Sequence, residues 1–188
     1  MDHAHVLGDL AERFDTVLEA IEATDGWVTN RVTPGKIILG ELGDIESGVR
    51  QLIRRRPLEV VEVTLPSGQK LRVPTPDETL RIKGYLIVRR NQVRDYLDVA
   101  ALSDRLGSSH AAQVLRDIDD YYSDQRASAS EGVTTQLVRQ LADPRPADTR
   151  TITQLDAYKG LEARWSNWKN VVSTCRSVAV EMTRWRLA

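Results

Sequence analysis

The sequence predicts an α+β fold: a small antiparallel sheet flanked by helices, followed by a C-terminal helical bundle. Short segments rich in β-forming residues alternate with turn signals between residues 27 and 73, which indicates hairpins. Apolar residues recur at helical spacing before and after this region, and 188 residues suffice to bury a core. We expect two regions, a core over residues 1–106 and a C-terminal helical region over residues 107–188.

The first residues predict an amphipathic helix that ends at Asp25-Gly26. His3 and His5 precede most of it, and because His110 is distant in the sequence we expect a mobile tail there rather than a metal site. The apolar positions of the predicted helix are Val6, Leu7, Leu10, Phe14, Val17, Leu18 and Ile21.

Two hairpins follow this helix. Pro34-Gly35 marks the turn of the first hairpin, and Pro66-Ser67-Gly68 marks the turn of the second. A further segment between the hairpins can add a third strand to the first one. The expected strands are residues 27–32, 36–41, 47–53, 58–65 and 70–73.

The helix that follows the second hairpin has a clear start. Thr75 can cap it, Pro76 suits the first helical position, and Glu78 completes a capping box. Lys83 lies farther along this helix, between the apolar neighbours Leu86 and Ile87. An ammonium group among apolar side chains is unfavourable unless a partner pairs with it.

A second helix begins close by, with Asn91 as its expected cap. Arg94, Asp95 and Asp98 lie on one side of it, and the short link between the helices brings this side near Lys83 and Arg90. The sequence therefore predicts a compact mixed-charge site. The residues alone leave two interpretations open, a functional site and a buried salt-bridge network that ties the two helices together.

The C-terminal region is expected to be helical. A helix resumes after Gly107 and continues to about Asp124, residues 127–131 form a polar linker, and residues 133–141 form a short helix. A long last helix carries an apolar stripe from Tyr158 through Trp165, Trp168 and Cys175 to Met182, and it also contains Trp185. The stripe indicates core packing, and Cys175 is expected to be a small core residue.

Composition narrows the classes of function. A net charge of -1 gives no global attraction to nucleic acid, so an RNA contact would need a local basic patch such as the run Arg54, Arg55 and Arg56. The same run can equally be a solvated strand end. No apolar stretch approaches membrane-spanning length, and the single cysteine excludes an internal disulfide. These features predict a cytoplasmic location.

The helix pair resembles a known family. A central lysine, an arginine one or two turns later, and then R-D-x-x-D before a small apolar run are similar to the closing motifs of the AbiEii/AbiGii and MenT-type nucleotidyltransferase toxins. The resemblance implies a partial polymerase-β-like core in residues 1–106. It also implies a toxin of a toxin–antitoxin system that transfers a nucleoside monophosphate from a nucleoside triphosphate to an RNA acceptor, with the 3′ end of a transfer RNA as the expected acceptor. Magnesium would be the cofactor and a cognate antitoxin the protein partner.

The resemblance also assigns roles. Lys83 and Asp98 would be catalytic, and Arg90, Arg94 and Asp95 would support them. Arg54, Arg55 and Arg56 lie outside the matching motif and are candidates for RNA phosphate contacts by their charge alone. The family's Ser/Thr-x-Asp metal-binding motif is missing from this sequence, so the main metal-binding carboxylates are expected upstream of Met1. Without these carboxylates, this chain could be inactive. The alternative is a non-catalytic module, a truncated or degenerate nucleotidyltransferase that binds RNA or protein.

Overall fold

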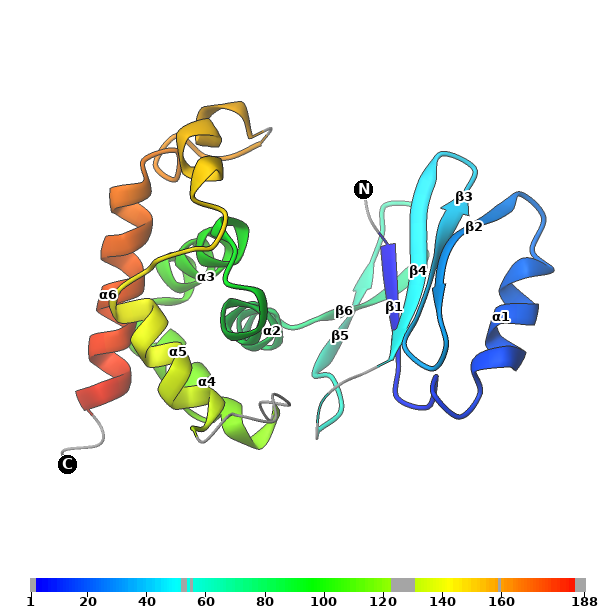
Figure 1. The fold of residues 1–188 in the computed structure, drawn as a ribbon, viewed down its shortest axis with the longest axis horizontal. Helices are drawn as coiled ribbons and strands as arrows, with labels where there is room; N and C mark the ends of the chain where they lie inside the picture. Colours follow the sequence, from blue (N-terminus) through cyan, green and yellow to red (C-terminus); the bar gives the residue numbers. More distant parts are fainter. Residues whose placement is uncertain (1–2, 52–53, 55, 123–130, 159, 185–188) are drawn as a thin grey trace. The chain divides into compact units, whose positions relative to one another are not determined.

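The computed structural model describes residues 3–51, 54, 56–122, 131–158 and 160–184. The chain forms two compact units, Met1–Pro57 (unit 1) and Leu58–Ala188 (unit 2) (Figure 1). The α+β class is confirmed, because each unit combines antiparallel strand pairs with helix. The division at residue 106 that the sequence suggested falls inside unit 2, at the end of a helix.

Unit 1 is a four-stranded sheet with one helix. The strand order is β1-β4-β3-β2, in which β1 runs parallel to β4 and the other pairs are antiparallel. A small core of Leu10, Phe14 and Ile38 holds the helix on the sheet. The elements are β1 (His3–Leu7), α1 (Phe14–Glu22), β2 (Trp27–Thr33), β3 (Ile37–Leu42) and β4 (Ile45–Gln51).

The first hairpin and the third strand are confirmed, but the beginning of the chain differs from the prediction. His3 and His5 lie in β1 instead of a mobile tail, and the helix starts only at Phe14. The reason is a long-range contact, since β1 pairs with β4 from His3 opposite Ser47 to Leu7 opposite Gln51. Hydrogen bonding along a parallel partner strand overrides the helical spacing of the local apolar residues.

Unit 2 begins with the second predicted hairpin and continues with helices. Its elements are β5 (Val60–Thr64), β6 (Lys70–Pro74), α2 (Pro76–Arg90), α3 (Val93–Leu106), α4 (Ser108–Arg116), η1 (Ile118–Asp120), α5 (Val133–Ala142), η2 (Thr149–Ala157) and α6 (Trp168–Arg184). The hairpin is a separate two-stranded sheet, so the expected single small sheet is in fact two. None of the helices in the described ranges has the length and hydropathy that a bilayer crossing requires.

One continuous core holds the helices of unit 2 together. Buried side chains of α3, α4 and α5 pack against the inner face of α6, which contributes Val171, Cys175, Val178 and Met182, and α2 packs against α3, α4 and α5. Arg81 of α2 connects the helices to the β5–β6 hairpin. Its guanidinium pairs with Glu59 at 2.7 Å and lies 4.4 Å from the centroid of the Tyr121 ring. This arrangement joins the residue before β5 to α2 and to the segment after η1.

Two helix boundaries in unit 2 differ from the sequence expectation. The helix after Gly107 ends at Arg116 instead of continuing to Asp124, and the expected linker at residues 127–131 falls almost wholly outside the described residues. The last helix begins at Trp168, so Tyr158 and Trp165 precede it, and Trp185 lies outside the described residues. Trp165 is nevertheless buried, as the apolar stripe predicted.

Gly84 permits a close approach of α2 to its neighbours. A Cβ atom at this position would lie 2.7 Å from Leu115 Cδ2 and 3.2 Å from Leu137 Cδ2, and both leucines are fully buried. An added methyl group would therefore press on these two leucines. We expect Gly84→Ala to lower the free energy of unfolding by about 1–3 kcal/mol through overpacking, although alanine favours a helix more than glycine does. Urea unfolding measures the free energy of unfolding of the variant and of the wild type. Gly8→Ala is the control, because no atom lies within 4 Å of its added Cβ, and equal stability of the two variants would contradict the close packing.

Cys175 provides a second test of the core. Burial raises the pKa of its thiol to about 12, whereas an unfolded chain has a cysteine pKa of about 8.5. The folded state therefore keeps the proton that the unfolded state loses, so stability should be full below about pH 8.5 and should decrease as the pH rises toward 12. Chemical unfolding at increasing pH measures this decrease. The decrease should be smaller in Cys175→Ala, and an identical pH profile in both proteins would contradict a buried thiol.

Candidate functional site

The start of α2 is as the sequence predicted. The helix begins at Pro76, and the backbone N–H of Glu78 donates to Thr75 Oγ1 at 3.1 Å. Asp77 and Glu78 lie in the first turn, where the positive end of the helix dipole favours carboxylates. This well-defined start fixes the position of Lys83 and Arg90, about two and four turns farther along the helix.

Lys83 pairs with Asp98 across the contact between α2 and α3. Lys83 Nζ lies 2.7 Å from Asp98 Oδ2, and the two side chains are 24% and 41% exposed. A cavity of about 460 Å³ lies beside the pair, and its lining includes Glu162 and Trp165. The ammonium group is thus neutralised by a residue of the chain itself, so it does not depend on a ligand for its charge partner.

Arg90 and Asp95 form a second and more buried pair. Arg90 Nε and Nη2 donate to the two carboxylate oxygens of Asp95, both at 2.7 Å, and the Asp95 side chain is 0% exposed. The bidentate hydrogen bond to Asp95 and the negative charges of Asp95 and Asp98 raise the pKa of Arg90, although burial alone would lower this pKa. This geometry stabilises a carboxylate that would otherwise be buried without a counterion.

The turn between the two helices is held by the segment after α5. Asn91 adopts left-handed backbone angles (φ 52°) and ends α2, so the predicted helix-starting role of Asn91 is wrong, and Gln92 precedes α3 instead. The Asn91 amide donates to the carbonyl of Arg145 at 2.7 Å, and its Oδ1 accepts from Tyr96 at 2.6 Å. The N–H of Val93 donates to Asp148 Oδ1 at 2.8 Å. Asp148 therefore caps the start of α3, because the side chain of Gln92 makes no capping hydrogen bond.

The structure thus brings together most of the predicted site residues, but as two ion pairs rather than one cluster. Arg94 is exposed on α3. Of the arginine run in unit 1, Arg54 is half-buried, Arg56 is exposed, and Arg55 lies outside the described residues. Both pairs connect α2 to α3, which agrees with the salt-bridge network that the residues alone left open.

The geometry offers little for metal chemistry. Within the described part of the chain, no group of three or more His, Cys, Asp or Glu side chains is placed to hold a metal ion. Asp95 and Asp98 each have a cationic side chain at hydrogen-bonding distance. Magnesium binding therefore stays a prediction from the resemblance, and no observation tests it.

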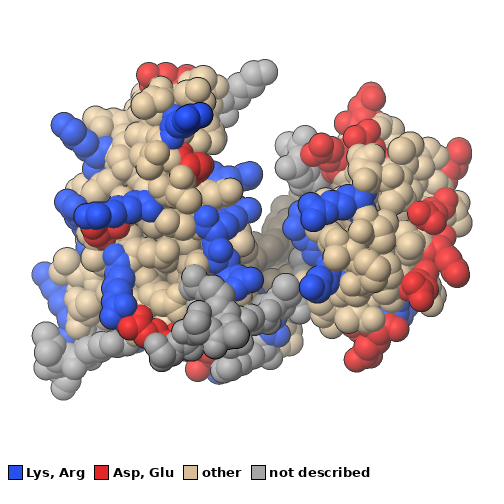
Figure 2. Space-filling model, viewed as in Figure 1, with Lys and Arg blue, Asp and Glu red and all other residues tan. Residues whose placement is uncertain are grey.

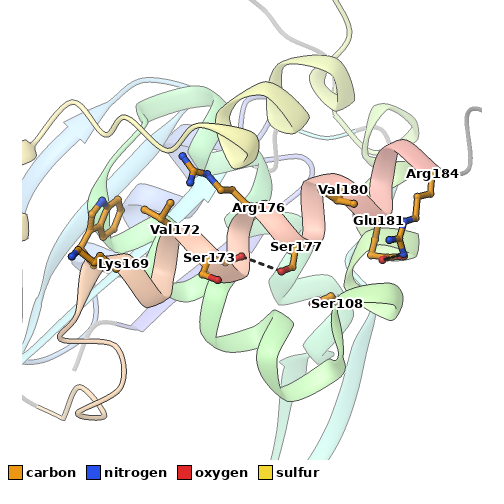
Figure 3. A pocket seen from close by; sticks show the side chains of 10 residues that line it. Ser108, Lys169, Val172, Ser173, Arg176, Ser177, Val180, Glu181 and Arg184 are labelled. Carbon is orange, nitrogen blue, oxygen red and sulfur yellow. Dashed lines mark hydrogen bonds and ion pairs between the residues drawn. The ribbon is translucent and has the colours of Figure 1, made fainter.

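A groove on α6 was missed by the sequence analysis. It has a volume of about 690 Å³, and Figure 3 shows its lining side chains along one side of the helix, with Ser108 at the start of α4. Lys169, Arg176 and Arg184 recur there at intervals of seven and eight residues, opposite the buried stripe. This spacing is visible in the sequence, but by itself it is typical of the solvated side of any amphipathic helix.

Comparison with known proteins points away from the nucleotidyltransferases. The chain is 46% identical over 129 residues to the heme uptake protein MmpL11 of Mycobacterium tuberculosis and to the probable transport protein MmpL11 of Mycobacterium bovis. It is 44% identical over 129 residues to the mycolic acid-containing lipids exporter MmpL11 of Mycolicibacterium smegmatis. The aligned part is 69% of this chain but only 13% of each relative. No family model matches the chain. No solved structure matches it.

The aligned segment must include much of unit 2. Unit 1 has only 57 residues, so more than half of the 129 aligned residues belong to the unit that holds the two ion pairs and α6. The similarity to transport proteins therefore concerns the same residues that suggested an enzyme.

These findings correct the functional interpretation. The resemblance to AbiEii/AbiGii nucleotidyltransferase toxins is wrong, because the relatives at 44–46% identity are named as transport proteins. The enzyme, the toxin function and the partners that followed from it, namely transfer RNA, nucleoside triphosphate and an antitoxin, are overturned with it. The alternative of a degenerate nucleotidyltransferase that binds RNA or protein fits these relatives no better.

The two ion pairs should differ sharply in their contribution to stability. Arg90→Ala leaves the fully buried Asp95 carboxylate without its partner, so we expect a loss of about 3 kcal/mol or more in the free energy of unfolding. Lys83→Ala removes a partner of a much more exposed carboxylate and should cost about 1 kcal/mol or less. Urea unfolding of both variants measures the difference. Equal losses would contradict the assignment of Arg90–Asp95 as the main structural pair.

Proposed function

We propose that this chain is a water-facing domain of an MmpL11-type transport protein, located on the cytoplasmic side of the membrane. The observation that carries the proposal is 44–46% identity over 129 residues to proteins named for transport. Identity at this level over more than a hundred residues favours a common fold and a related role. Since the chain spans only 13% of the length of these relatives, transport itself belongs to the larger protein.

The surface of unit 2 supports a domain that lies in water. Its helices bury one side and carry charged side chains on the other, such as Arg94 on α3, Arg139 on α5 and Arg176 on α6. The unit contains 19 Lys and Arg and 17 Asp and Glu, which gives a net charge of +2. The single cysteine supports the cytoplasmic side, because it cannot form an internal disulfide.

The two ion pairs fit this role as structural elements. They fix α2 against α3, and the turn between these two helices is hydrogen bonded to residues 145–148. A domain attached to a moving transporter must keep its shape while its attachment points change, and the charge-assisted hydrogen bonds to the buried Asp95 favour one arrangement of the helices. The cargo named for the relatives, heme in one case and mycolic acid-containing lipids in another, would be carried elsewhere in the protein.

A chimeric transporter tests the proposal. In Mycolicibacterium smegmatis without its own MmpL11 lipids exporter, the gene is restored with its matching segment replaced by this chain. We expect export of mycolic acid-containing lipids to return to the level of the native transporter, measured by lipid extraction from the cell envelope. The same chimera with Arg90→Ala should export less, because its domain is destabilised.

Two controls make the outcome decisive. Immunoblots must show that the chimera, the native transporter and a transporter without the segment are present in equal amounts. If the transporter without the segment exports as well as the chimera, or if the abundant chimera exports nothing, the proposal is wrong.

A further inference from the structure

The outer side of α6 forms a surface that packing inside the domain does not require. We call it the basic groove and define it by Lys169, Val172, Ser173, Arg176, Val180 and Arg184 (Figure 3). These residues lie opposite the buried stripe of the same helix. All are exposed except Val172, which is half-buried.

The basic groove carries positive charge that the protein neutralises only in part. Arg184 pairs with Glu181 at 2.5 Å, and Glu181 is the single acidic residue of α6. Arg176 Nε donates to the carbonyl of Ala142 at 3.1 Å, which orients the guanidinium without cancelling its charge. Lys169 and Arg176 therefore present two uncompensated charges along about two turns of helix.

Apolar groups lie between these cations. Val180 is 50% exposed, and Val172 lies two turns earlier on the same side. Ser173 and Ser177 are small, and the Ser177 hydroxyl donates to the backbone carbonyl of Ser173 at 3.1 Å, so these serines leave a hollow between the longer side chains. A helix face that combines lysine, arginine and exposed aliphatic groups is suited to the boundary between water and lipid headgroups.

The same face is poorly suited to nucleic acid. Binding of single-stranded nucleic acid uses exposed aromatic rings on which bases stack. The aromatic residue that lines the groove, Trp168, packs edge to face against Tyr96, with 6.0 Å between the ring centroids and 84° between the ring planes. Its ring is therefore engaged in the core contact between α3 and α6.

The charge of the two units agrees with an anionic surface as the partner of unit 2. Unit 1 has 7 Lys and Arg and 10 Asp and Glu, for a net charge of -3, whereas unit 2 has a net charge of +2. Figure 2 shows the visible Lys and Arg side chains spread mainly over unit 2 and most visible Asp and Glu side chains on unit 1. An anionic surface would thus attract unit 2 and repel unit 1.

We propose that the basic groove docks unit 2 on the anionic phospholipids of the membrane in which the transporter is embedded. Lys169, Arg176 and Arg184 would contact lipid phosphates, while Val172 and Val180 would reach the headgroup boundary. The inference rests on the proposed function, which attaches the domain to a membrane protein. Attachment makes weak binding sufficient, because a tethered domain experiences a high effective concentration of lipid.

Vesicle binding of the 188-residue chain tests the inference. Sedimentation with phosphatidylcholine vesicles that contain about 30% phosphatidylglycerol should show binding that weakens with added salt, and pure phosphatidylcholine vesicles should bind much less. Each lysine or arginine near such a surface contributes about 1 kcal/mol, or about fivefold in the partition coefficient. The triple variant Lys169→Gln, Arg176→Gln and Arg184→Gln should therefore bind about 100-fold more weakly.

The matched control removes the same number of positive charges elsewhere in unit 2. Lys70→Gln, Arg72→Gln and Arg145→Gln change exposed residues outside the groove, and this variant should keep most of the binding. Equal loss in both triple variants, equal binding to neutral vesicles, or binding of a labelled single-stranded RNA in place of anionic vesicles would overturn the inference. The chain alone is measured, so a negative result here is distinguishable from a failure of the chimeric transporter.

Discussion

The bidentate pair between Arg90 and Asp95 is the interaction on which the helical unit depends. It places a fully buried carboxylate at the start of α3 and an arginine at the end of α2, so the direction of the second helix is fixed by the first. Because Tyr96 and Leu97 follow on the buried side of α3, this direction also decides how α3 meets α6. The contacts of Asn91 with Arg145 and Tyr96 then hold the turn in place.

The same residues explain why the sequence suggested an enzyme. R-D-x-x-D after a lysine-bearing helix is a pattern that a catalytic site can use, but it is also what two crossed helices need to neutralise charges at their contact. The structure shows Lys83 and Arg90 each satisfied by a carboxylate of α3. The expected nearness of the α2 cations to the α3 carboxylates agrees with the two pairs, whereas the enzyme inferred from it is wrong, because the relatives are named as transport proteins.

Several predictions based on local signals succeeded, whereas the strand that depends on a distant partner was missed. Pro34-Gly35 and the Thr75-Pro76 cap gave the first hairpin and the start of α2 correctly, since turns and caps depend on neighbouring residues. The strand at His3–Leu7 depends on a partner about 44 residues away, and no local pattern marks such a pairing. Trp165 is buried as expected but precedes α6, because apolar spacing reports which side is buried better than it reports the helix boundary.

The basic groove was overlooked for a related reason. A row of Lys169, Arg176 and Arg184 resembles the solvated side of any amphipathic helix until the lining of the groove, the exposed Val180 and the single acidic residue of α6 are considered together. Charged residues thus serve two purposes in unit 2. Inside the domain they fix helices against one another, and on its surface they define the side that we propose faces lipid.

A double-mutant cycle tests most directly whether the motif of α2 and α3 serves structure. Arg90→Met and Asp95→Asn are made singly and together, and the same is done for Lys83→Met and Asp98→Asn, with unfolding in urea as the readout. The account predicts a coupling energy of about 2–3 kcal/mol for Arg90 with Asp95 and below about 1 kcal/mol for Lys83 with Asp98. Negligible coupling between Arg90 and Asp95, with both single variants as stable as the wild type, would contradict it.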